Sequence, residues 1–187
     1  MEFKHLNKFL TLLNKNNSRE WFEKNRLEYE NLKIDFTQFL SLLIAGLSKY
    51  DRQIAAVEAK KAMFRINRDV RFSSDKSPYK TNFGASIKQE GKKSDYAGYY
   101  IHIEPKKSFL AGGLYLPEAG ILKKVREAID YDPAIFRKIL SSKNFKSYFK
   151  ELQGAQLKNP PKGFDAAHPA LDLLKFKSFL MVHPLKN

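Results

Sequence analysis

The sequence contains no cysteine. Disulfides, cysteine-ligated zinc, iron–sulfur clusters and thiol catalysis are therefore excluded. The chain also has no apolar run of the roughly 18 residues that a membrane-spanning helix needs. Its amphipathic N-terminus lacks the apolar core and the small-residue cleavage site of a signal peptide. We therefore expect a cytoplasmic protein with no membrane contact.

Motifs of common catalytic and metal sites are missing as well. The chain has no H-E-x-x-H, no G-x-S-x-G and no EF-hand loop, and its four histidines lie far apart in the sequence. The glycine pair Gly112-Gly113 lacks the G-x-G-x-x-G spacing of a nucleotide loop, so it indicates a bulge or a close backbone approach. We expect no metal and no cofactor.

Positive charge is abundant. The chain has 34 Lys and Arg against 20 Asp and Glu, a net charge of +14 that is spread along its whole length. Such a field attracts polyanions over a Debye length of about 10 Å, although scattered lysines also serve solubility alone. With 187 residues and 43% hydrophobic side chains, the composition predicts one globular domain over residues 1–187.

The first 50 residues have helical periodicity. Apolar residues at helical spacing predict a short amphipathic helix over residues 3–14. A second helix is expected from about Ser18 to Tyr50, with a bend near Asn25-Arg26. Asn17 followed by Glu20 is typical of a capping box. The expected buried stripe of this helix is Leu32, Phe36, Phe39, Leu43 and Leu47. The two helices should form an antiparallel pair.

From Ala62 the apolar period changes to two. Four strands are expected, at residues 64–72, 79–87, 96–104 and 109–117, and their short connections favour an antiparallel meander. Helices are expected at 118–130 and 132–141, and 172–182 is typical of a helix end leading into a strand. The predicted fold class is α+β: an N-terminal helical hairpin, an antiparallel sheet meander of four or more strands, and C-terminal helices packed on the sheet.

The central segment RINRDVRFSSDKSPYKTNFGASI (65–87) carries a resemblance. It is similar to the signature of domain of unknown function 2461, a set of conserved hypothetical, mainly bacterial proteins. NNSREWFEKNRLEYE, YYIHIEP, AGGLYLP and LKNPPKGFDAAHP extend the likeness over almost the whole chain. The resemblance implies a compact intracellular domain without an assigned activity, and it transfers no catalytic residues to this sequence.

The densest group of charged residues lies at residues 65–82, where five basic side chains accompany two carboxylates. If two strands pair across a turn at 73–78, several of these side chains share one face. Arginine captures phosphate or carboxylate with two hydrogen bonds, and lysine adds a point charge. The expected ligand-binding residues are Arg65, Arg68, Asp69, Arg71, Asp75, Lys76, Tyr79, Lys80 and Asn82. The plain alternative is a structural ion-pair network, with Asp69 holding Arg65 or Arg71.

A second candidate site is Tyr100, His102 and Glu104, which alternate onto one face of the third strand. His102 and Glu104 are weak candidates for acid–base catalysis, and a packed histidine with one hydrogen bond is the plainer reading. The leading hypothesis is a binding protein for a phosphate- or carboxylate-bearing ligand, contacted by Arg65, Arg71 and Lys80. The alternatives are an enzyme that acts on such an anion through His102 or Glu104, and a basic nucleic-acid-binding domain. The sequence leaves the oligomeric state open.

Overall fold

The computed structural model describes residues 1–186, and the chain divides into two compact units. The first unit contains residues 1–94, 99–110 and the C-terminus from Pro184, and the second contains 95–98 and 111–183. This division by contacts does not test whether the units fold independently, so the single domain stays a prediction. Within residues 1–186, no helix is long and apolar enough to cross a membrane.

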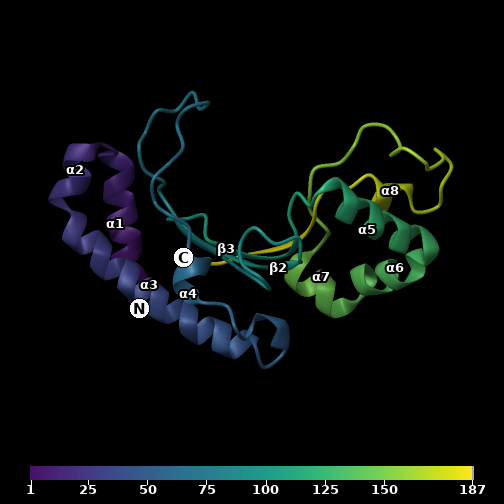
Figure 1. The fold of residues 1–187 in the computed structure, drawn as a ribbon, viewed down its shortest axis with the longest axis horizontal. Helices are drawn as coiled ribbons and strands as arrows, with labels where there is room; N and C mark the ends of the chain where they lie inside the picture. Colours follow the sequence, from purple (N-terminus) through teal and green to yellow (C-terminus); the bar gives the residue numbers. More distant parts are fainter. Residues whose placement is uncertain (187) are drawn as a thin grey trace. The chain divides into compact units, whose positions relative to one another are not determined.

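Three helices open the first unit: α1 (Phe3–Lys15), α2 (Arg19–Lys24) and α3 (Arg26–Leu47). They confirm the helical hairpin, and the second helix breaks at Asn25, where the bend was expected. Figure 1 shows α1 beside α2 and the start of α3.

The predicted capping box is wrong in its first residue, because Ser18 and not Asn17 caps α2. Ser18 caps α2 by accepting a hydrogen bond from the Trp21 backbone N–H at 3.2 Å. The Asn17 side chain instead binds both backbone groups of Tyr79: its amide donates to the carbonyl at 2.9 Å, and its oxygen accepts from the N–H at 3.1 Å. Asn17 therefore fastens the start of α2 to a segment 62 residues away.

The buried stripe of α3 packs against the first strand of the sheet. Phe36 and Tyr29 contact the Phe83 ring at centroid distances of 5.4 and 5.9 Å. The stripe consists of Tyr29, Leu32, Phe36, Leu40 and Ile44. Two of the five expected positions are correct, and the other three, Phe39, Leu43 and Leu47, are partly buried beside it.

The sheet contains β1 (Phe83–Lys88), β2 (Gly98–Ile103), β3 (Phe109–Leu114) and β4 (Phe179–Pro184). The strand order is β1-β2-β3-β4, which confirms the antiparallel meander. On β1 and β2 the core face carries Phe83, Ala85, Ile87, Ile101 and Ile103. The opposite face carries Tyr100 and His102, which are only partly buried.

The expected strand at residues 64–72 is wrong. After the short helices η1 (Arg52–Ile54) and α4 (Ala59–Ala62), the chain forms only isolated bridges, Met63 with Ala85 and Asn67 with Tyr79. Side-chain carboxylates capture backbone N–H groups in this segment, and such local bonds compete with a strand ladder. We call residues 65–82 the basic loop. In Figure 1 this loop extends away from the neighbouring helices.

The second unit is mainly helical, with α5 (Ala119–Tyr131), α6 (Pro133–Ser141), α7 (Lys143–Phe149) and α8 (Leu171–Leu174). The first two confirm the expected helices, and Asp132 caps α6 ahead of Pro133. The buried core consists of Ile129, Ala170, Leu173, Leu174, Phe176 and Phe179, so helices of this unit pack on β4.

Gly113 explains the glycine pair of β3. Its φ is +119°, and a Cβ there would lie 2.1 Å from the carbonyl oxygen of Phe179. Only glycine permits this approach between β3 and β4.

Candidate functional site

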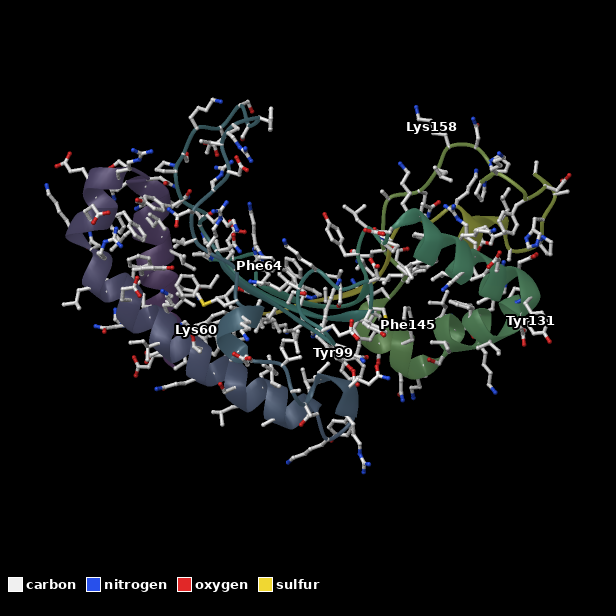
Figure 2. The ribbon with its side chains drawn as sticks, in the orientation of Figure 1. Lys60, Phe64, Tyr99, Tyr131, Phe145 and Lys158 are labelled. Carbon is white, nitrogen blue, oxygen red and sulfur yellow. The ribbon has the colours of Figure 1, made fainter. Side chains whose placement is uncertain are left out.

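The first unit contains a pocket of about 340 Å³ beside α3. One wall is formed by α3 and the end of α2, and the other by residues 60–67 and Tyr79. The lining side chains are Phe22, Arg26, Tyr29, Glu30, Lys33, Thr37, Lys60, Met63, Phe64, Arg65, Ile66, Asn67 and Tyr79. Figure 2 labels two of them, Lys60 on α4 and Phe64 just after it.

Positive charge dominates the lining. Its basic side chains are Arg26, Lys33, Lys60 and Arg65, against one carboxylate. That carboxylate, Glu30, accepts from Lys33 at 3.0 Å, and Arg26 pairs with Glu23 outside the pocket. Among residues 1–186, neither Lys60 nor Arg65 forms a salt bridge. The pocket therefore offers two basic side chains without an acidic partner.

Aromatic side chains form the inner wall. The rings of Phe22 and Tyr79 stack at 4.0 Å with an interplanar angle of 16°. Burial, helped by the charge of Glu30, raises the pKa of Tyr29 to about 12. Tyr29 therefore stays a neutral phenol at physiological pH. The inner wall of the pocket is thus apolar, and the charged side chains lie at its rim.

The basic loop brings together only part of the predicted ligand-binding set. Arg65 and Tyr79 line the pocket. Arg71 donates to both oxygens of Asp69 at 2.9 and 2.7 Å, which lowers the pKa of that carboxyl. The Lys76 ammonium donates to the carbonyl of Val70 at 3.0 Å. Arg71, Asp69 and Lys76 thus bind other parts of the loop.

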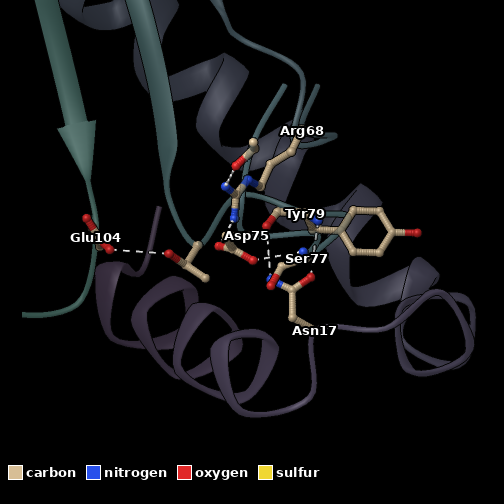
Figure 3. Close-up of polar contacts among 8 residues, drawn as sticks. Asn17, Arg68, Asp75, Ser77, Tyr79 and Glu104 are labelled. Atoms are coloured by element: carbon tan, nitrogen blue, oxygen red, sulfur yellow. Dashed lines mark hydrogen bonds and ion pairs between the residues drawn. The ribbon is translucent and has the colours of Figure 1, made fainter. Parts of the chain in front are cut away.

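Arg68 and Asp75 form a second ion pair across the loop, shown in Figure 3 with Ser77 beside it. Hydrogen bonds from Ser77, then the contact with Arg68, lower the pKa of Asp75 below its usual range. The plain alternative of a structural network therefore describes Arg68, Asp69, Arg71 and Asp75 well. Of the two partners expected for Asp69, Arg65 and Arg71, the salt bridge forms with Arg71.

Lys80 lies next to Arg65, as the paired segments were expected to place it. Its ammonium donates to the Arg65 carbonyl at 3.0 Å. Burial, and then the positive charges of Arg65 and Lys92, lower the pKa of Lys80. The ammonium groups of Lys80 and Lys92 lie 5.5 and 5.1 Å from the centroid of the Phe64 ring. Sequence reasoning assigned Lys92 to a turn and missed it.

The second candidate site is a hydrogen-bonded line on the open face of β2. His102 Nδ1 lies 3.0 Å from the Tyr100 hydroxyl, and His102 Nε2 lies 3.1 Å from Glu104 Oε2. Asn82, just before β1, reaches Nδ1 at 3.4 Å. Thr81 donates to Glu104 Oε1 at 3.2 Å (Figure 3). Asn82 therefore connects the two groups that the sequence singled out separately.

Sequence reasoning also missed the contribution of α3 and α4 to the pocket. Arg26, Lys33 and Lys60 sit on helices whose polar faces look like ordinary solvated surface. Only the packing of α3 beside residues 63–67 reveals them. In residues 1–186, no three His, Asp or Glu side chains are grouped as a metal site.

The fold and the site define an α+β protein with a basic, aromatic-walled pocket and a polar sheet face beside it. Residues 5–187 match the family described as "Conserved hypothetical protein (DUF2461)". The chain belongs to this family, which confirms the resemblance of its central motif. Comparison with curated proteins and with solved structures found no match.

Proposed function

We propose that this protein binds a small phosphate- or carboxylate-bearing molecule in the pocket, with Arg65 and Lys60 contacting the anion. The observation that carries the proposal is that these two basic side chains line a pocket of about 340 Å³ and form no salt bridge within residues 1–186. The volume falls in the range of small-molecule sites, roughly 300–1,000 Å³. A cytoplasmic location stays a prediction.

The chemistry of the lining supports an anion with an apolar body. Arg65 offers a planar fork suited to two hydrogen bonds with phosphate or carboxylate, and Lys60 adds a point charge. Phe22, Tyr29 and Tyr79 supply an apolar wall. Bound anion would also relieve the repulsion between Arg65 and Lys80, which already lowers the pKa of that lysine.

The basic loop has a supporting role in this proposal. Unlike the expectation from sequence, we place Arg71 outside the anion contacts, because its Nε and Nη2 already donate to the two oxygens of Asp69. Arg68, Asp75 and Lys76 keep the loop in shape. Lys80 acts on Arg65 through its hydrogen bond and its charge.

Two arginine variants of equal charge test the proposal. Arg65→Ala should weaken the binding of inorganic phosphate, measured by isothermal titration calorimetry, by about tenfold or more, since a charge-assisted hydrogen bond contributes about 1.5–3 kcal/mol. Arg71→Ala is the matched control and should leave the affinity within about twofold. Both variants should melt close to the wild type. Equal weakening in both variants, or a wild type that does not bind phosphate, would reject the pocket.

An enzyme acting on such an anion is a second candidate function. It is supported by one observation: Tyr100, His102 and Glu104 form a continuous hydrogen-bonded line. The plainer reading, a packed histidine with one hydrogen bond, would not require this connected series of hydrogen bonds. In this candidate His102 or Glu104 serves as the acid–base group.

A further inference from the structure

The hydrogen-bonded line on β2 has a defined direction. The tautomer of His102 that carries its proton on Nε2 satisfies all three contacts, because Nδ1 can then accept from the Asn82 amide at 3.4 Å. The Tyr100 hydroxyl then donates to the same nitrogen at 3.0 Å. The proton of the imidazole sits on Nε2 and is donated to Glu104 at 3.1 Å. In this tautomer the Nδ1 lone pair of His102 is aimed at the Tyr100 proton.

Packing fixes both rings in this arrangement. The His102 ring stacks on Phe109 at 4.7 Å with an interplanar angle of 15°, and the Tyr100 ring contacts Phe109 at 5.7 Å. Beneath the Tyr100 hydroxyl lies Gly84, which has no side chain to displace it. The side chains of His102 and Glu104 are 15% and 27% exposed, so the line is sheltered and still reachable from solvent.

Two ammonium groups lie near Phe64, the ring that contacts Tyr100. Phe64 packs edge-on to the Tyr100 ring at 6.1 Å, and Lys80 and Lys92 lie 5.5 and 5.1 Å from the Phe64 ring. Each ammonium spends one hydrogen bond on a backbone carbonyl, which leaves donors for an anion. Neither forms a salt bridge within residues 1–186. An anion held by these lysines would lie next to Tyr100.

We propose that Glu104, His102 and Tyr100 form a proton relay, with the Tyr100 hydroxyl as the group that meets an anionic substrate held by Lys80 and Lys92. This inference deepens the enzymatic candidate and rests on it, but it does not require the pocket at Arg65. The substrate class is a phosphate- or carboxylate-bearing molecule that also carries a hydroxyl to be deprotonated.

The proposed step moves two protons and breaks no other bond. The substrate hydroxyl gives its proton to the Tyr100 oxygen, while Tyr100 gives its own proton to His102 Nδ1. The products are a substrate alkoxide, an intact phenol and an imidazolium. Glu104, bonded to Nε2, stabilises the imidazolium, and the two lysines stabilise the alkoxide. Asn82 and Phe109 are positioning residues, because they orient His102 without meeting the substrate.

A reactive anion tests the relay without knowledge of the substrate. In para-fluorosulfonyl benzoate the carboxylate suits the two lysines, and the sulfonyl fluoride reacts with activated tyrosine. The Tyr100 oxygen attacks sulfur, the S–F bond breaks, fluoride leaves, and the phenol proton passes to His102. Peptide mapping by mass spectrometry should find Tyr100 labelled at least about tenfold faster than Tyr50 and Tyr131, although those two side chains are each 92% exposed.

The variants separate the relay from simple exposure. His102→Gln should slow Tyr100 labelling by about tenfold or more, the usual scale of general-base assistance. Glu104→Gln keeps the shape and a hydrogen-bonding group and should slow it to a smaller extent. Arg71→Ala removes one positive charge from a side chain that is paired with Asp69, and it should leave labelling unchanged. A neutral benzenesulfonyl fluoride should lose the preference for Tyr100 if the lysines hold the probe's carboxylate.

Three other results would reject the proton relay. Labelling of Tyr100 at the rate of Tyr50, or equal rates in His102→Gln and wild type, overturns the relay. Labelling confined to Lys80 or Lys92 shows that the anion docks there while Tyr100 is not activated, which also rejects it. Thermal melting of both variants guards against unfolding, and Glu104→Gln keeps the test decisive if His102→Gln does not fold.

Discussion

Gly84 is the residue on which the Tyr100 position depends most directly. A Cβ at position 84 would lie 2.7 Å from the Tyr100 hydroxyl and 3.3 Å from its ring, which is too close for atoms in contact. Strand β1 therefore accepts a glycine, with its entropic cost, where a side chain would block the aromatic ring of the neighbouring strand.

Gly84→Ala should push the Tyr100 ring away and break its hydrogen bond to His102. We expect a loss of about 1–3 kcal/mol of unfolding free energy, as for other overpacked sites. The ¹⁵N shifts of the His102 ring should change as its Nδ1 partner leaves. Gly46→Ala is the control: a Cβ in α3 meets nothing within 4 Å, so this variant should be more stable by about 0.5–1 kcal/mol. A Gly84→Ala variant with unchanged stability and unchanged His102 ring shifts would show that Gly84 does not confine the Tyr100 ring.

Single charged residues illustrate what spacing in a sequence can and cannot predict. The dense arginines of residues 65–71 were visible at once, but the partners of each were not. Asp69 is adjacent to Arg68 and four residues from Arg65, but it pairs with Arg71, two residues further along the chain. That choice follows from the local turn, in which the Arg71 N–H also bonds Asp69.

At the scale of elements, the basic loop is held in two ways. Its base is fixed by the uncharged pair of hydrogen bonds between Asn17 and Tyr79. Its outer part depends on the carboxylates Asp69 and Asp75, each bonded to an arginine and to a backbone N–H. Only the outer part can therefore respond to protonation of a carboxyl group.

The outer loop should lose order in acid. The pKa values of Asp69 and Asp75 are lowered in the folded protein, by Arg71 and by Ser77 with Arg68 respectively. A lowered folded-state pKa stabilises the loop above the unfolded value of 3.8, and this contribution is lost as pH falls through the folded values. Amide signals of residues 68–77 should therefore broaden or shift below about pH 4.

Asn17 and Tyr79 provide the comparison within the same experiment, because their hydrogen bonds involve no titrating group. Their amide signals should stay in place until the whole protein unfolds. Asp75→Asn should produce the acid-like state of the outer loop at neutral pH. Outer-loop amide signals of the wild type that stay in place in acid until the whole protein unfolds would contradict a role for these carboxylates.

At the scale of the whole molecule, the net charge of +14 is the feature from which the alternative of nucleic-acid binding was predicted. Charge spread over the surface binds polyanions through counterion release, which is strongly salt-dependent. Anion binding in the pocket would depend instead on one or two side chains. The two functions therefore respond differently to the same substitution.

A single-stranded oligonucleotide should bind weakly and lose affinity steeply between about 50 and 200 mM salt, by about 10³-fold if roughly six phosphates are contacted. Arg65→Ala should reduce the salt slope by no more than about one unit, whereas it should weaken phosphate binding strongly. Fluorescence anisotropy across a salt series measures the slope. Oligonucleotide binding abolished by Arg65→Ala alone would instead make the pocket the nucleic-acid site.

The long helices and three of the four expected strands were predictable because their apolar periodicity is local, whereas the short helices α4 and α7 were not predicted. Residues 3–15 and 119–131 show their buried side at a period of 3.6, and β2 and β3 alternate. The strand expected at 64–72 failed for the opposite reason: its alternation is real, but Asp69 and Asp75 compete for the backbone. The alternation of apolar and polar residues does not reveal this competition for backbone hydrogen bonds.

The sequence by itself determined the α+β class, the membership of the DUF2461 family and the concentration of charge at residues 65–82, because these depend on periodicity, motif and composition. Only the tertiary structure decided which cations are neutralised and which line a pocket. That decision rests on contacts between distant segments, such as Asn17 with Tyr79 and Asn82 with His102. Ion pairing falls off within a few ångströms, so the partners of a charge are settled by packing and not by its neighbours along the chain.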